Sequence, residues 1–267
     1  PVFYQMTRAF LVGRMTGRGF TAPLVIALKN TESGLHVDAV LLAEAELLHQ
    51  ALDDVFGWEL VQMGLWGQPR GLLDGCRTQR NTIVAQAAPA DNGDHAPDVV
   101  ARLSQLPIAN AAVDAVLLPH TLEFEHDPYA VVREADRVLA GEGQLLVIGF
   151  RPWSLWGMRG RAVRRGFPPG ARRSLSEGRV RDWLELLGYD VITVKRYLFA
   201  PPWGEPEKSL TGGSSLLKRG WLRLWPAGAY LLKARKRVYT LTPIRPRLRE
   251  RPHVIGGLVK PTTRNRP

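Results

Sequence analysis

The sequence has little cysteine and no long apolar segment. Cys76 is the single cysteine among 267 residues, which excludes a disulfide framework and leaves no cysteine cluster for a metal. A chain of this composition is expected in a reducing cytoplasm. No apolar run approaches the ~18 residues of a transmembrane helix, so no transmembrane segment is expected. Residues 1–15 lack the long apolar core of a secretory signal, and none is expected.

Acidic residues are scarce in the second half of the chain. Residues 38–150 hold six Lys and Arg against 17 Asp and Glu, whereas residues 151–267 hold 26 against seven. The formal net charge of +11 therefore averages an acidic half and a strongly basic half. Such an asymmetry indicates a polyanionic partner, either a nucleic acid or a membrane surface.

Length and periodicity divide the chain into three parts. With 267 residues and 45% hydrophobic content, the chain is long enough for one α/β domain with appendages. Residues 1–37 show no sustained period and are interpreted as an N-terminal extension of uncertain order. Residues 38–236 are expected to form the domain. Residues 237–267 are basic and proline-rich without a packing pattern, which predicts a disordered tail.

Apolar strands alternate with helices along the domain. Apolar residues recur at three- and four-residue steps from Val40 to Phe56, which predicts an amphipathic helix that ends at Gly57. Strands are expected over residues 58–63, 81–86, 98–103, 113–118, 144–150, 190–199 and 227–236. Nearly continuous apolar strands alternating with helices are typical of a sheet that is covered by helices on both faces.

Two of the helices carry start signals. Asp127 is expected to cap a helix with Pro128 at its first position, where the missing N–H costs nothing. The glycines of GEG at 141–143 are expected to stop that helix. Ser174 and Glu177 have the spacing of a capping box ahead of an apolar stripe. Both signals place helices between predicted strands.

A pattern of known type runs from residue 103 to residue 150: LSQLPIANAAVDAVLLPHTLEF, READRVL and GEGQLLVIGF. It resembles the type-11 branch of the class I S-adenosylmethionine-dependent methyltransferases. FRPWSLWG (150–157) and LFAPPW (198–203) extend the resemblance to a smaller bacterial group of methyltransferases. The resemblance implies a Rossmann-like α/β sheet, mostly parallel with one antiparallel strand, and S-adenosyl-L-methionine as cofactor. It also implies methyl transfer to an unidentified acceptor, either a small molecule or RNA.

The resemblance further implies where the cofactor lies. It places the cofactor over the loop after the first strand, with its adenine near Leu103 and with His120 at the inner edge. The residues expected at the cofactor are Met63, Gly64, Leu65, Gly67, Leu103 and His120. His120 could lie beside the cofactor or the acceptor and act as a base if its pKa is near neutrality, or it could hydrogen-bond a neighbouring loop. No catalytic residue is assigned, because methyl transfer from a sulfonium mainly needs in-line positioning. No metal ligand is predicted, because the spacing of the histidines and acids in HTLEFEHD (120–127) matches no ligand motif.

Several positions depart from the pattern of that family. Gln62 replaces the acidic residue before the glycine loop, the bulky Trp66 lies within the loop, and Arg102 stands where the family has Asp. The strand at 81–86 also ends without a carboxylate to hold the ribose hydroxyls. These departures motivate a second hypothesis, in which a methyltransferase-like fold without catalysis binds a polyanion, either RNA or a membrane surface.

The segment 151–173 holds seven Arg and no acid, together with the aromatic residues Trp153, Trp156 and Phe167. Four interpretations are open. The segment could be a lid over the substrate pocket, because the family inserts specificity elements there. Its side chains could contact phosphates and stack bases, it could lie on an anionic lipid surface, or it could be a solvated linker. The basic tail 237–267 could strengthen contact with a polyanion.

Overall fold

The structure is a computed structural model that describes residues 34–88, 96–162, 170–199 and 226–238. Most of the expected N-terminal extension and of the basic tail therefore lies outside the described residues. The helical elements are α2 (Gly34–Leu52), the 3-10 turn η1 (Gly71–Leu73), α3 (Thr121–Phe124), α4 (Pro128–Val138), α5 (Leu155–Ala162) and α6 (Glu177–Leu186). The strands are β1 (Phe56–Met63), β2 (Arg77–Ala85), β3 (Val99–Val100), β4 (Val113–Pro119), β5 (Leu139–Phe150), β6 (Tyr189–Tyr197) and β7 (Ala229–Lys236).

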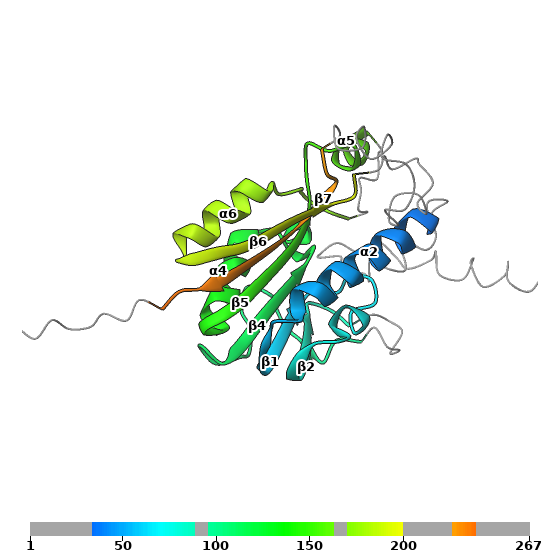
Figure 1. Cartoon of the computed structure of the whole chain (residues 1–267). Coiled ribbons are helices and arrows are strands. Elements are labelled where there is room, and N and C mark those ends of the chain that lie inside the picture. The colour runs from blue at the N-terminus through cyan, green and yellow to red at the C-terminus, as the bar shows by residue number, and fades with distance from the viewer. Residues whose placement is uncertain (1–33, 89–95, 163–169, 200–225, 239–267) are drawn as a thin grey trace, which may run out of the picture.

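The seven strands form one sheet in the order β3-β2-β1-β4-β5-β7-β6. β7 is antiparallel to both of its neighbours, β5 and β6, whereas the other neighbouring strands pair in parallel. This arrangement confirms the predicted Rossmann-like sheet, mostly parallel with one antiparallel strand. Figure 1 shows the sheet with α2 along one face and with α4 and α6 along the other.

The strand order reverses at β1. From β1 the chain moves outward to β2 and β3, and then returns to place β4 on the other side of β1. Val61 pairs with Val116, and Met63 pairs with Val84, so the carboxyl ends of β1, β2 and β4 meet at one edge. Open α/β sheets bind their ligands in the crevice at such a reversal. The fold therefore brings the loops after β1, β2 and β4 to the place where a ligand is expected.

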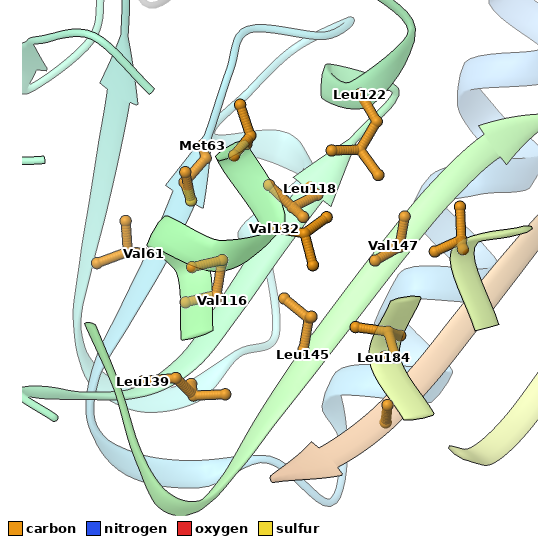
Figure 2. Packing of buried hydrophobic residues seen from close by; sticks show 14 of the residues in the cluster. Val61, Met63, Val116, Leu118, Leu122, Val132, Leu139, Leu145, Val147 and Leu184 are labelled. Atoms are coloured by element: carbon orange, nitrogen blue, oxygen red, sulfur yellow. The ribbon is translucent and has the colours of Figure 1, made fainter. Parts of the chain in front are cut away.

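Alternation along the strands sends apolar side chains to both faces of the sheet. Val61, Val116 and Val147 pack with residues of α4 and α6 in one cluster, which Figure 2 shows. Leu60 and Leu117 are one position away along their strands and belong to a second cluster, with α2. Burying an aliphatic side chain of this kind contributes about 1.5–3 kcal/mol. Both helical layers are therefore fixed to the sheet by their apolar faces.

Helix α2 extends further back than predicted and ends earlier. It begins at Gly34, within the expected extension, and ends at Leu52. The predicted helix end at Gly57 was wrong, because Phe56 and Gly57 already pair with β2. None of the described helices combines the length and hydropathy that a membrane crossing requires.

Helix α4 also ends earlier than predicted. Its last residue is Val138, so the glycines at 141–143 do not stop it, and that prediction was wrong. Leu139 is fully buried and pairs with Val113 of β4. Strand pairing therefore begins directly after the helix and ends it.

The start of α6 corrects a further prediction. The N-cap is Ser176, whose hydroxyl accepts a hydrogen bond from the Arg179 N–H at 3.3 Å. The predicted capping box from Ser174 to Glu177 was wrong, because Glu177 is the first helical residue. Its carboxylate accepts bonds of 2.8 and 3.0 Å from Arg196 of β6 instead. The acidic side chain therefore fixes the helix to the sheet.

The start of α4 is as predicted and gives a first test. Asp127 accepts a hydrogen bond from the Ala130 N–H at 3.1 Å, with Pro128 at the first helical position. Replacing Asp127 by Ala is expected to lower the free energy of unfolding by about 1 kcal/mol, because the Ala130 N–H loses its acceptor. Asp127→Asn keeps an acceptor oxygen and is the control. Urea denaturation followed by circular dichroism measures both variants, and equal losses would contradict a capping role.

Candidate functional site

The loop after β1 is tied to the turn after β4. Gly64 leaves β1 with a φ of +100°, a conformation that L side chains rarely adopt, and its N–H donates to the Val84 carbonyl at 2.7 Å. The Thr121 hydroxyl donates to the Met63 carbonyl. A Cβ at Gly64 would lie 2.6 Å from Thr121 Oγ1. The two segments therefore approach so closely that glycine is required at position 64.

His120 is the residue directly after β4, and it is fully buried. Its backbone has a φ of 54°, and its N–H donates to the Ile148 carbonyl at 3.0 Å. Nε2 lies 3.0 Å from Oε1 of Glu44 on α2, and Nδ1 lies 3.3 Å from Oε2 of Glu123 on α3. The imidazole is therefore placed between two buried acids.

Glu44 also accepts hydrogen bonds from two aromatic side chains. The Trp66 indole N–H donates to Oε2 at 2.6 Å, and the Tyr197 hydroxyl donates to Oε1 at 2.9 Å. Glu44 is itself fully buried. A buried carboxylate is stable only where such donors satisfy its oxygens, and the donors around Glu44 compensate for its burial in this way.

Two aromatic rings pack against His120. Its ring centroid lies 4.2 Å from that of Phe150, with an interplanar angle of 26°, and 4.2 Å from that of Trp66, at 41°. The Phe150 N–H donates to Glu123 Oε1. Because aromatic faces attract cations, these surroundings favour a protonated imidazole.

The charges around His120 determine its protonation. Burial by itself lowers the pKa of His120, but the negative charge of Glu44 and the hydrogen bond and charge of Glu123 raise that pKa to about 9. Burial raises the pKa of Glu123, against the hydrogen bond and charge of His120. These surroundings therefore favour the protonated form of His120 at neutral pH, in which both ring nitrogens donate hydrogen bonds.

Comparisons with known proteins agree with this architecture. Residues 76–147, from the start of β2 into β5, match a family model described as "Methyltransferase domain". A SAM-dependent methyltransferase from Archaeoglobus fulgidus gives a TM-score of 0.54 at 15% identity, over 77% of this chain and 97% of that chain. The geranyl diphosphate C-methyltransferase of Streptomyces coelicolor A3(2) was solved with S-adenosyl-L-homocysteine. It gives a TM-score of 0.53 at 18% identity, over 84% of this chain and 91% of that chain. The fold is that of a class I methyltransferase.

Two relatives are similar to parts of the sequence. The protein YafS of Escherichia coli (strain K12) is 41% identical over 97 residues, which make up 36% of this chain and 40% of YafS. Residues 1–57 match a family model described as "Isocitrate dehydrogenase kinase/phosphatase (AceK), regulatory domain". The isocitrate dehydrogenase kinase/phosphatase of Xanthomonas euvesicatoria pv. vesicatoria (strain 85-10) is 48% identical over 46 residues, 17% of this chain and 8% of that protein. The chain thus covers less than half of either relative. Helix α2, which carries Glu44, lies outside the methyltransferase-domain match.

The class I methyltransferase fold brings several predicted cofactor residues to the edge where β1 meets β4. Met63 and Gly64 lie against Thr121, which directly follows His120. Leu103 is buried together with Met63 in the cluster on the α4 face. Met63, Gly64 and His120 therefore lie at one edge of the sheet, and the contact of these residues and of Leu103 with a cofactor stays a prediction.

The rest of the glycine loop packs on α2. Leu65 is half-buried beside the cluster on the α2 face. Gly67 has a φ of 58°, and a Cβ there would lie 2.5 Å from Leu41 Cδ2. Trp66, which departs from the family pattern, is buried with its indole N–H directed at Glu44. In this methyltransferase fold Trp66 is therefore part of the buried polar cluster.

Two residues of the cluster, Glu44 and Tyr197, were not predicted from the sequence. Glu44 lies on the side of α2 that also carries Leu41 and Leu48, because residues three and four apart share a helix face. A carboxylate within an apolar stripe needs a buried partner, and this signal could have identified Glu44. Tyr197 ends β6, and no local pattern relates it to α2.

A carboxylate from another part of the chain, that of Glu125, lies at the end of β2. Gln86, the first residue after β2, donates from its side-chain amide to Glu125, which follows α3. Burial raises the pKa of Glu125. Arg102, which stands where the family has Asp, is exposed and forms a backbone bridge with Gln105. The acid that β2 itself lacks is therefore brought close by the turn after β4.

The structure describes part of the basic segment 151–173. A Cβ at Gly228 would lie 2.6 Å from Trp156 Cδ1, so buried Trp156 packs beside the start of β7 and is not available to stack on a base. Trp153 is 75% exposed. Residues 163–169 and nearly all of the tail lie outside the described residues. The role of this segment and the contact with a polyanion stay predictions.

Proposed function

We propose that this protein transfers a methyl group from S-adenosyl-L-methionine to an acceptor, either a small molecule or RNA. The observation that carries the proposal is the close approach of the loop after β1 to the turn after β4, with Gly64 against Thr121. Ligands in open α/β sheets bind at this edge. Glycine there lets a cofactor approach the backbone without an intervening Cβ.

The residues present at this edge fit the cofactor. Gln62 donates from Nε2 to the Gly64 carbonyl at 3.1 Å. Its Oε1 is buried and has no hydrogen-bond partner within the part of the chain that the structure describes. A buried acceptor without a donor favours a ligand that brings one. The amino group of the methionine part of S-adenosyl-L-methionine is such a donor, and Gln62 would bind it.

Polar groups at the end of β2 fit the ribose. Gln86 and Glu125 form a hydrogen-bonded amide and carboxylate pair there. An amide and a carboxylate together can donate to and accept from hydroxyl groups. The pair would therefore hold the ribose hydroxyls in place of the carboxylate that β2 lacks.

The chemistry that the cofactor supplies is a methyl group on a positively charged sulfur. The protein's part is to bind and orient the donor and the acceptor, because an in-line approach is the main requirement of this transfer. His120 is protonated at neutral pH, so it orients neighbouring groups and does not remove a proton from the acceptor.

Calorimetric titration with S-adenosyl-L-methionine and with S-adenosyl-L-homocysteine tests the proposal. Both ligands are expected to bind saturably, and ligand at 100 times its Kd should raise the free energy of unfolding by about 2.7 kcal/mol. Glu125→Gln should weaken both ligands about tenfold, since an ionised acceptor is lost. Glu185→Gln on the exposed side of α6 is the matched control and should bind like the wild type. The absence of heat and of a thermal shift at millimolar ligand would reject the proposed function.

A further inference from the structure

The carboxylate of Glu44 joins three segments that are far apart in the sequence. It accepts hydrogen bonds from Trp66 in the loop after β1, from His120 in the turn after β4 and from Tyr197 at the end of β6. All three partners are buried. The proposed cofactor loop, the turn beside it and the far strand therefore meet at a single side chain of α2.

The loop after β1 depends on contacts from outside itself. Between Gly64 and the start of β2, its regular structure consists of the three-residue turn η1. Helix α2 contacts the loop along its length, because Leu41 lies against Gly67, His49 lies against Gly75 and Glu44 binds Trp66. The contact of Glu44 with Trp66 is a charged hydrogen bond in a buried environment, which makes it the strongest of the three.

We propose that Glu44 is the positioning residue of the cofactor loop, which it holds through the indole of Trp66. The proposal rests on the proposed function, in which residues Met63 to Gly67 bind S-adenosyl-L-methionine. It states that Glu44 maintains the loop conformation that this binding requires. Nothing in the geometry requires Glu44 to touch the cofactor. Its effect passes through the Trp66 side chain to the backbone of the loop.

The three donors explain why a carboxylate is needed. His120 and Tyr197 share Oε1 of Glu44, whereas Trp66 binds Oε2. In Glu44→Gln, the amide oxygen can keep His120 and Tyr197, and the NH₂ group then faces the indole N–H of Trp66. Two donors cannot bond to each other. The substitution therefore removes the acceptor of Trp66 and, with it, the negative charge beside His120, with almost no change in side-chain volume.

A double-mutant cycle with Glu44→Gln and Trp66→Phe tests the proposal. Trp66→Phe removes the indole N–H but keeps an aromatic ring beside His120 and Phe150. Each single variant is expected to bind S-adenosyl-L-methionine and S-adenosyl-L-homocysteine about 10- to 100-fold more weakly, as for the loss of a charged hydrogen bond. The double variant should bind no more weakly than Glu44→Gln, since Phe presents no donor to the new amide.

The matched control is Glu46→Gln, two residues along the same helix. Glu46 is exposed and accepts a hydrogen bond from Gln50. This variant should bind both ligands like the wild type. Unchanged ligand affinity in Glu44→Gln, together with lower thermal stability, would overturn the proposal and leave Glu44 a purely structural residue. Additive losses in the double variant would also overturn it.

A measurement without ligand separates this proposal from the proposed function. Acrylamide quenching is compared between the wild type and Trp66→Phe, and between Glu44→Gln and the double variant. Each difference isolates the fluorescence of Trp66. We expect Trp66 to be protected from acrylamide where Glu44 is present and to be accessible to acrylamide in the Glu44→Gln background. If the wild type binds neither ligand, the proposed function fails while the quenching result still decides whether Glu44 holds the loop. Equal protection of Trp66 in both pairs would overturn the positioning role.

Discussion

A His120→Leu variant is expected to lose about 3–5 kcal/mol of unfolding free energy at pH 7, as for other buried charge pairs from which one partner is removed. In the wild type the imidazolium lies between Glu44 and Glu123, and all three side chains are buried. Leucine fills a similar volume but leaves two acids in an apolar environment without a cation between them. Urea denaturation followed by circular dichroism measures the loss.

His126→Leu is the matched control for this substitution. His126 is exposed and lies six residues further along the chain. The same chemical change there should alter the free energy of unfolding by less than about 0.5 kcal/mol. Similar losses in the two variants would contradict the importance of the buried cluster.

The same cluster predicts how stability depends on pH. The folded-state pKa of His120 is about 9, above its ordinary value of 6.5. Its contribution is therefore fully present below about pH 6.5 and is lost as the pH rises through about 9, a change on the order of 3 kcal/mol. The titratable groups in contact with His120 are Glu44 and Glu123, and Tyr197 in turn contacts Glu44. Burial raises the pKa of Glu123 and of Tyr197. A pH series in urea should show this decline in the wild type and not in His120→Leu.

Gly64→Ala is expected to destabilise the protein by about 1–3 kcal/mol and to abolish most of the proposed binding of S-adenosyl-L-methionine. Alanine at a φ of +100° is strained, and its Cβ would lie 2.6 Å from Thr121 Oγ1. Because the Thr121 hydroxyl is already bonded to the Met63 carbonyl, the loop itself must move. A shift of about 1 Å at a binding site is enough to lower affinity tenfold or more.

Gly178→Ala tests whether glycine replacement as such is harmful. Gly178 lies in α6, and a Cβ there meets nothing within 4 Å. This change should stabilise the protein by about 0.5–1 kcal/mol, since alanine is the better helix former. Calorimetry and urea denaturation on both variants give the comparison. Wild-type affinity in Gly64→Ala would mean that the cofactor does not use this loop.

The sheet could be predicted because its buried strands are visible as apolar runs. QLLVIGF (144–150) forms the second half of β5. Its adjacent residues Leu145 and Leu146 pack against the helices on opposite faces of the sheet, as expected of a strand that is covered on both faces. Element ends were less predictable. Ser174 and Ser176 are identical cap candidates two residues apart, and the choice between them depends on the contact of Glu177 with Arg196. Local sequence does not contain that contact.

Only those site residues whose position follows from the adjacent sequence could be predicted. Gly64 and His120 each follow a strand that the sequence shows, so their positions at the sheet edge could be inferred. The contact of His120 with Glu44 could not be inferred, because Glu44 is 76 positions away, and Tyr197 reaches Glu44 from the edge strand β6. In the sequence, Trp66 was recognised as a departure from the glycine-loop pattern of the family. Its hydrogen bond to Glu44 gives that departure a physical reason.

The position of β7 has a consequence for how the chain is completed during synthesis. β7 is the last described strand to be made, yet it lies between β5 and β6, and β6 has no other neighbour in the sheet. Tyr197 pairs with Ala229, so the end of β6 is anchored only when the first residue of β7 has left the ribosome. Helix α2 is the first described element to emerge, and it must wait for this last strand before Tyr197 can reach Glu44. An unfinished chain therefore leaves one side of β5 unpaired, and such a strand is prone to wrong pairing until Ala229–Lys236 inserts between β5 and β6.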